Sequence, residues 1–308
     1  MAPGVCADNH DLEDGGMTEA RKAARGMGWL PDWPDLRDYT AEHELIAPLL
    51  ARTHLKAPKK KLPAAADLRE WCPPVEDQGQ IGSCTANAGV ALVEYFERRA
   101  SGKHVDASRL FLYKATRNLL NLKGDTGAYL RTTMGALVLF GVPPERFWAY
   151  EPKALDKEPP AFCYAFAANY RTMSYFSLDP PGTKPAELIE RVKTYVAGGI
   201  PSMFGFTVYS SIEQAGADGA IPFPGTKEKV QGGHAVVAVG YDDAKKIRNR
   251  EGGAKATTGA FLVRNSWGAG WGDGGYGWLP YEYVASGLAE DWWTLIKAEW
   301  VDSGEFGL

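Results

Sequence analysis

A cysteine lies where the sequence predicts the start of a helix. Residues 78–84 read Gln-Gly-Gln-Ile-Gly-Ser-Cys, and the apolar period that follows predicts a helix over residues 84–100. Unpaired N–H groups at a helix start favour an anion, so we expect a lowered pKa and a nucleophilic thiolate at Cys84. Taken by itself, however, a free cysteine is more often a small buried core residue.

A histidine provides a candidate base. His234 lies near the start of an apolar strand, residues 232–241, which read Gly-Gly-His-Ala-Val-Val-Ala-Val-Gly-Tyr. A lone histidine in such a strand is more often a hydrogen-bonded structural residue. It is the only one of the five histidines in a strong structural element, and the other four lack metal-ligand spacing. We therefore expect no metal site.

An asparagine could orient that histidine. Residues 261–276 read Phe-Leu-Val-Arg-Asn-Ser-Trp-Gly-Ala-Gly-Trp-Gly-Asp-Gly-Gly-Tyr, which places Asn265 at the end of an apolar strand. Its side chain can hold one ring nitrogen of an imidazole, while Trp267 screens that hydrogen bond from water.

These three blocks together resemble the papain/cathepsin family of cysteine peptidases, in the order and at the separations typical of that family. The resemblance spans about residues 64–300. It implies that Cys84 is the nucleophile, His234 the base and Asn265 the residue that orients the base. It also implies that Gln78, with the backbone N–H of Cys84, donates to the oxyanion of the tetrahedral intermediate.

The same resemblance implies where a peptide substrate binds. Gly127 falls in the glycine-rich wall that pairs with an extended peptide, and Ala235 borders the pocket for the second side chain on the acyl side of the cut. Trp267 is also assigned to substrate binding.

Two residues depart from the family pattern. Ile81 replaces a disulfide cysteine, and Thr85 replaces the tryptophan that normally follows the nucleophile. The sequence therefore resembles a disulfide-poor variant, and its four cysteines do not form a disulfide scaffold. Whether Cys72 and Cys163 pair stays open.

The element order predicts an α+β fold, with the helices before most of the strands. We expect helices at 84–100, 108–121, 129–140 and 185–198, and strands at 200–209, 234–241, 261–265, 276–279 and 293–300. By the resemblance, residues 64–308 form a papain-like two-lobe domain with the cleft between the lobes. The mainly helical lobe covers about 64–175, and the lobe with an antiparallel β-sheet or barrel covers about 176–308.

Residues 1–63 form an N-terminal extension of different character. Exposed Trp29 and Trp33 would be costly in water, so we expect this segment to pack on the enzyme in cis, as a docking segment or pro-segment. The lysines at 59–61 fit either a solvated linker or a processing site.

Composition excludes several classes of function. A net charge of −4 leaves no basic excess for nucleic acid, and we see no apolar run long enough to span a membrane. No signal peptide is apparent, so a cytoplasmic location is expected, although export by another route stays open. The glycines at 270, 272 and 275 match a dinucleotide-binding pattern but lead into an expected strand, so no cofactor is expected.

Three hypotheses for the function remain. The first is hydrolysis of polypeptides through a thioester acyl-enzyme. The second transfers the acyl group to an amine, as a ligase, cyclase or transpeptidase does. The third is a peptide-binding module without turnover, against which the intact set of four catalytic residue types argues.

Overall fold

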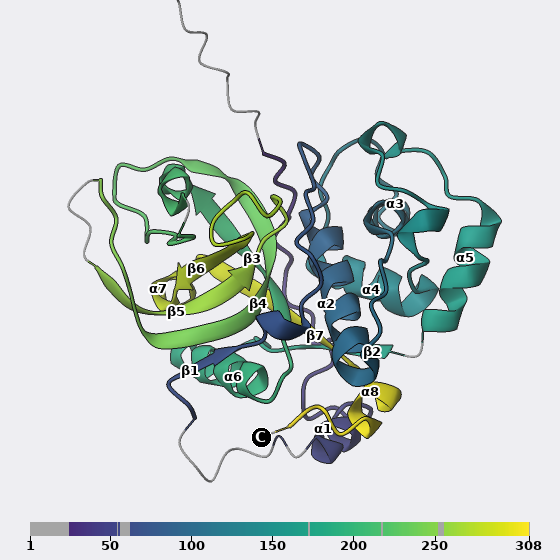
Figure 1. Ribbon diagram of the computed structural model, residues 1–308, viewed down its shortest axis with the longest axis horizontal. Coiled ribbons are helices and arrows are strands. Elements are labelled where there is room, and N and C mark those ends of the chain that lie inside the picture. Colours follow the sequence, from purple (N-terminus) through teal and green to yellow (C-terminus); the bar gives the residue numbers. More distant parts are fainter. Residues whose placement is uncertain are drawn as a thin grey trace, which may run out of the picture.

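The computed structural model describes residues 25–53, 55, 62–171, 173–216, 218–251 and 256–307. A helical lobe lies beside a lobe built on a β-sheet, and the N-terminal segment, drawn in purple, runs between the two (Figure 1). The predicted α+β two-lobe fold is therefore confirmed. The helical lobe contains α2 (Cys84–Ser101), α3 (Arg109–Leu119), α4 (Leu130–Phe140) and α5 (Ala161–Ala167).

The sheet is antiparallel and open. Its strands follow the order β2-β7-β3-β4-β5-β6, with β1 paired to β4. No pairing joins β2 to β6 in the described part of the chain, so the predicted alternative of a closed barrel does not apply. The strands are β1 (Ala65–Asp67), β2 (Met173–Ser177), β3 (Ser202–Tyr209), β4 (Val230–Ile247), β5 (Thr257–Arg264), β6 (Tyr276–Pro280) and β7 (Ala289–Lys297).

The remaining α-helices lie around this framework. They are α1 (Ala47–Arg52), α6 (Pro185–Ala197), α7 (Tyr281–Ala285) and α8 (Ala298–Asp302). The strand predicted at 293–300 is wrong at its end, because β7 stops at Lys297 and Trp300 lies in α8. There the Trp300 ring stacks on Phe96 of α2 at 4.8 Å, so the chain returns to the helical lobe.

Helix α2 is the element that carries Cys84, and it is buried from Cys84 to Phe96. Gly89 of α2 lies where helices α3 and α4 approach it closely. A Cβ at Gly89 would lie 3.2–3.3 Å from side chains of α3 and α4, so glycine lets these helices pack closely. Burial on all sides fixes the direction of α2 and so the position of its first residue.

Arg264 links the end of β5 to the chain that leads to the active site. Its buried guanidinium donates to the carbonyls of Pro73 and Pro74 at 2.6 and 2.5 Å and to the hydroxyl of Tyr276 at 3.3 Å. Asn265 follows directly, so this contact holds Asn265 against the loop before Gln78.

Replacement of Arg264 tests this anchor. We expect Arg264→Met to lower the free energy of unfolding by about 2–4 kcal/mol, because buried acceptors lose a charged donor. Half-buried Arg98 donates to the neighbouring carbonyl of Cys72 at 2.9 Å and provides a matched control. Arg98→Met should cost less than about 1 kcal/mol in urea unfolding. Equal losses for the two variants would contradict the assigned role of Arg264.

Candidate active site

Cys84 is the first residue of α2, and its side chain is fully buried. The loop before it is held by Asp125, whose carboxylate accepts the N–H of Gly82 at 2.8 Å and the hydroxyl of Tyr113 at 2.7 Å. Asn87, one turn into the helix, donates to the carbonyl of Ser83 at 3.0 Å. These contacts fix the backbone that presents the thiol.

His234 and Asn265 meet from neighbouring strands. His234 Nε2 lies 2.8 Å from Asn265 Oδ1, which also accepts the backbone N–H of Ser266 at 2.7 Å. Because Oδ1 can only accept, Nε2 carries the proton and Nδ1 keeps its lone pair. Nδ1 is buried without a hydrogen-bond partner, and the Trp267 ring stacks on the imidazole at 4.6 Å. The geometry leaves Nδ1 as the proton acceptor.

Gln78 lies in the same site with its amide fixed at both ends. Its Oε1 accepts the hydroxyl of Ser266 at 2.5 Å, and its Nε2 donates to the carbonyl of Ile81 at 2.9 Å. The same Nε2 also donates to the carbonyl of Gly26 at 3.1 Å. The donor expected to hold an oxyanion is thus already bound to the N-terminal segment.

That segment, residues 25–30, runs between the two lobes (Figure 1) and makes backbone hydrogen bonds with residues beside the candidate site. Arg25 Nη1 donates to the carbonyl of Trp267 at 3.1 Å, and the segment pairs by its backbone with both sides of the site. The backbone bonds are Gly26 N to Gly79 O at 3.1 Å, Trp29 N to Gly233 O at 3.1 Å, Leu30 N to Ala128 O at 3.1 Å and Ala128 N to Gly28 O at 2.8 Å.

Two glycines let the segment lie directly on the nucleophile loop. A Cβ at Gly28 would lie 2.0 Å from the carbonyl oxygen of Gly82, and one at Gly26 would lie 2.2 Å from that of Ile81. Both neighbours are backbone atoms, which cannot rotate away. Residues with side chains at these positions would force the segment off the loop.

The predicted substrate-binding residues lie along the same segment. Gly127 has a φ of +73°, and a Cβ there would lie 2.3 Å from the carbonyl oxygen of Gly28. The backbone pairing itself is made by the next residue, Ala128. Ala235 is buried in β4 opposite Gly205 of β3.

Burial controls the protonation of both candidate catalytic groups. It raises the pKa of Cys84 to about 11, although the backbone N–H groups of Ala235 and Gly28 and those at the helix start lower it. Burial also lowers the pKa of His234 to about 4, against the hydrogen bond with Asn265. Both shifts oppose the thiolate that the helix start favours, because burial favours the uncharged thiol and the uncharged imidazole.

The occupation of the site by residues 25–30 was not foreseen from the sequence. The docking expected for Trp29 is observed, since that side chain is 5% exposed, but Trp33 is 87% exposed. The sequence feature that could have indicated this docking is the pair Gly26 and Gly28, because glycine at alternate positions is typical of a chain that lies close to another backbone. Residues 1–24 and 56–61, including the lysine run, lie outside the described residues.

The described cysteines support the disulfide-poor interpretation. Cys72, Cys84 and Cys163 are free thiols, while Cys6 lies outside the described residues. Within the residues that the structure describes, no group of His, Cys, Asp and Glu could hold a metal ion, and no helix is long and apolar enough to cross a membrane.

The fold, together with the contact between His234 and Asn265, is that of a papain-like cysteine peptidase. The family model for papain family cysteine proteases matches residues 62–293. This chain belongs to the papain family of cysteine proteases, and it is a hydrolase that acts on peptide bonds.

Individual relatives agree with this assignment. An uncharacterized peptidase C1-like protein of Acanthamoeba polyphaga mimivirus is 32% identical, over 88% of this chain and 87% of that protein. The crystal structure of xylellain, a cysteine protease from Xylella fastidiosa, has a TM-score of 0.70 at 34% identity and covers 90% of this chain and 97% of that one. Digestive procathepsin L 3 of Tenebrio molitor, at 20% identity over 79% of this chain and 73% of that one, has a TM-score of 0.58 and shows the fold alone.

The protonation of His234 can be measured directly. An NMR titration of the full-length chain should give a midpoint of about 4 for this imidazole, well below its ordinary 6.5. The hydrogen bond with Asn265 raises the pKa and the charge of Arg25 lowers it, so Asn265→Ala should lower the midpoint and Arg25→Gln should raise it. A midpoint near 6.5 in the unaltered chain would contradict the burial of His234.

Proposed function

We propose that the chain is a cysteine peptidase held closed by its own residues 25–30, and that it hydrolyses peptide bonds through a thioester once this segment leaves. The observation that carries the proposal is the hydrogen bond from Gln78 Nε2 to the carbonyl of Gly26 at 3.1 Å. A peptide carbonyl of the chain itself occupies the donor assigned to the oxyanion, so a substrate carbonyl cannot use it.

The chemistry follows from the roles that the family resemblance gives to the catalytic groups. His234 Nδ1 takes the proton of the Cys84 thiol, and the sulfur attacks the carbonyl carbon of the scissile bond. The C–N bond breaks as the imidazolium returns the proton to the leaving amine. Water, deprotonated by the same nitrogen, then attacks the thioester, and the acid and the thiol are released. Asn265 keeps the ring oriented throughout, as the 2.8 Å contact supports.

The direction of the segment explains why it could remain uncut. From its N-terminus it passes Trp267 and Gln78 first, and it reaches Ala128 and Gly233 last. By the family resemblance the latter side receives the acyl part of a substrate, which is the N-terminal part. The segment therefore runs opposite to a substrate and pairs with Ala128 in a parallel bridge.

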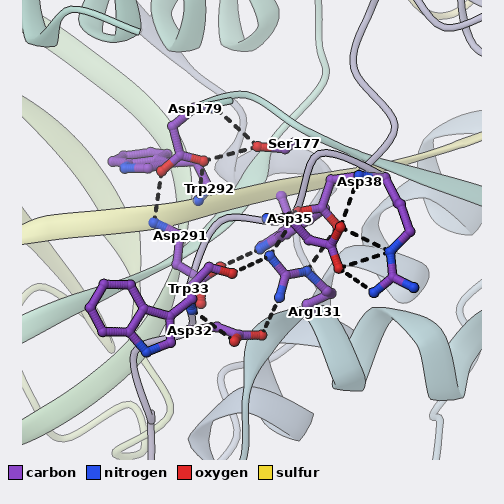
Figure 2. A network of polar contacts seen from close by, with 11 residues as sticks. Asp32, Trp33, Asp35, Asp38, Arg131, Ser177, Asp179, Asp291 and Trp292 are labelled. Carbon is purple, nitrogen blue, oxygen red and sulfur yellow. Dashed lines mark hydrogen bonds and ion pairs between the residues drawn. The ribbon is translucent and has the colours of Figure 1, made fainter. Parts of the chain in front are cut away.

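An ionic clamp holds the continuation of the segment on the helical lobe. Arg131 of α4 donates to the carboxylates of Asp32 at 2.5 Å and Asp38 at 2.7 and 2.8 Å, and to the carbonyl of Trp33 at 2.8 Å (Figure 2). Forked contacts of this kind are geometrically specific. These contacts support the proposal, because they fix residues 32–38, and with them the end of the covering segment, in one position on α4.

Substitution of Gly28 tests self-inhibition. We expect Gly28→Ala to push the segment off the nucleophile loop, because the added methyl would meet the carbonyl oxygen of Gly82. Labelling of Cys84 by an epoxysuccinyl probe and hydrolysis of a peptide substrate should both rise at least about 10-fold, which corresponds to a shift of about 1.4 kcal/mol in the opening equilibrium.

Matched controls separate opening from general damage. Gly135→Ala adds the same methyl within α4, where the nearest atom is 3.9 Å away, and should leave labelling unchanged. Cys84→Ala in the Gly28→Ala chain should abolish both signals. If the unaltered chain is labelled as fast as Gly28→Ala, the segment does not close the site. If the double variant still hydrolyses peptides, Cys84 is not the nucleophile.

The acceptor of the acyl group is tested by product mass. With the Gly28→Ala chain and millimolar glycinamide, we expect the acid formed by water as the main product, rather than the amide. A predominant glycinamide adduct would instead identify the enzyme as a transferase of the ligase or transpeptidase type.

A further inference from the structure

A tyrosine hydroxyl contacts both ends of the loop that carries the expected oxyanion donors. The hydroxyl of Tyr150 donates to the backbone carbonyl of Gln78 at 3.0 Å and lies 2.6 Å from Oγ of Ser83. Gln78 carries one expected donor in its side chain, and Ser83 directly precedes Cys84, whose backbone N–H is the other. Tyr150 itself belongs to the chain that follows α4 in the helical lobe. One hydroxyl from outside the loop therefore connects the two residues on which the donors depend.

The direction of these hydrogen bonds follows from what each atom can do. A carbonyl oxygen only accepts, so the single proton of the Tyr150 hydroxyl goes to the carbonyl of Gln78. In the 2.6 Å contact Ser83 is then the donor and Tyr150 the acceptor. Oγ of Ser83 in turn accepts the side-chain N–H of Asn87 at 3.0 Å. An ordered chain of donors thus runs from Asn87 in α2 to the carbonyl of Gln78, and the bonds of such a chain strengthen one another.

The loop that Tyr150 contacts has no regular structure to hold it in shape. Residues 78–83 form neither a helix nor a strand. The side chain of Gln78 and the backbone N–H of Ser83 both donate to the carbonyl of Ile81, at 2.9 Å each. Donors for an oxyanion must be preorganised, and a displacement of about 1 Å can cost about 100-fold in rate. A contact that fixes the two ends of this loop is therefore important for catalysis.

The tyrosine ring is itself held by a buried cation. The guanidinium of Arg109, the first residue of α3, lies over the Tyr150 ring at 4.1 Å from its centroid. Arg109 donates to the carboxylate of Glu145 at 2.8 and 3.1 Å and pairs with that of Glu76 at 3.0 Å. Two carboxylates thus fix the cation, and the cation fixes the ring. Burial raises the pKa of Tyr150 to about 12, although Ser83 and Arg109 lower it, so the hydroxyl keeps its proton at neutral pH.

We propose that Tyr150 is a positioning residue for the oxyanion site: its hydroxyl holds Gln78 and the start of α2 at the separation at which their N–H groups bind one oxyanion. Tyr150 acts through these donors and not on the substrate. This inference rests on the proposed function, because the donors meet a substrate only after residues 25–30 leave.

The experiment removes the hydroxyl alone, in the full-length Gly28→Ala chain. We expect Tyr150→Phe to lower kcat for a peptide substrate about 10-fold or more, because a donor moves away from the oxyanion. KM should change less than about 2-fold, since the lost interaction is made only in the transition state. Exchange of the Cys84 thiol with dipyridyl disulfide forms no oxyanion, so its rate should stay within about 2-fold of that of the Gly28→Ala chain.

A second variant and a matched control test the same chain of hydrogen bonds. Ser83→Ala removes the donor to Tyr150 and should lower kcat about 3-fold or more by itself. Added to Tyr150→Phe it should cost less than it does alone, because the hydroxyl that it contacts is already gone. Tyr164→Phe removes another hydroxyl of the helical lobe, which bonds to the carboxylate of Glu158 at 2.6 Å, and should leave kcat unchanged.

The outcomes separate this inference from the proposed function. A kcat in Tyr150→Phe no lower than in Tyr164→Phe would overturn the inference, while hydrolysis by the Gly28→Ala chain still supports the proposed function. Thiol exchange that falls as far as kcat would also overturn it, because the variant would then have disturbed Cys84 itself. Fully additive losses in the double variant would do the same. If the Gly28→Ala chain neither hydrolyses peptides nor has a reactive Cys84, both fail.

Discussion

The backbone contact between the loop before Cys84 and residues 26–28 is the interaction on which the state of the active site depends. It has no side chain on the segment side, because the two glycines leave room only for main-chain atoms. The loop that must approach a substrate closely is therefore equally able to accept the chain's own backbone. In the proposed function, closure of the site and recognition of a peptide use the same surface.

This contact also accounts for the electrostatics of the closed site. Helix α2 begins at Cys84 and contributes N–H groups that favour a thiolate, yet burial removes the water that would stabilise the charge. The desolvation dominates, and it acts on His234 in the opposite direction. Both shifts thus favour the uncharged form and have one cause, the exclusion of solvent.

Much of the fold was predictable from the sequence because its signals are local. The helices beginning at Cys84, Arg109, Leu130 and Pro185 follow from apolar period, and three of them also have glycine or proline at an end. The end of β7 was not predictable, since Trp300 turns into α8 to reach a ring far away in the sequence. The contact of His234 with Asn265 agrees with the role expected from the motifs, whereas the raised pKa of Cys84 comes from burial, which no motif indicates.

Residues 25–30 belong to the same chain as the site they cover, and this affects the equilibrium between the closed and open forms. A covalently attached occupant faces an effective concentration in the millimolar range for a flexible connection, whatever the concentration of the protein. Dilution would leave the closed fraction unchanged, and the open fraction would be set by a unimolecular equilibrium. A free peptide of the same sequence would have to reach comparable concentrations to occupy the site as fully.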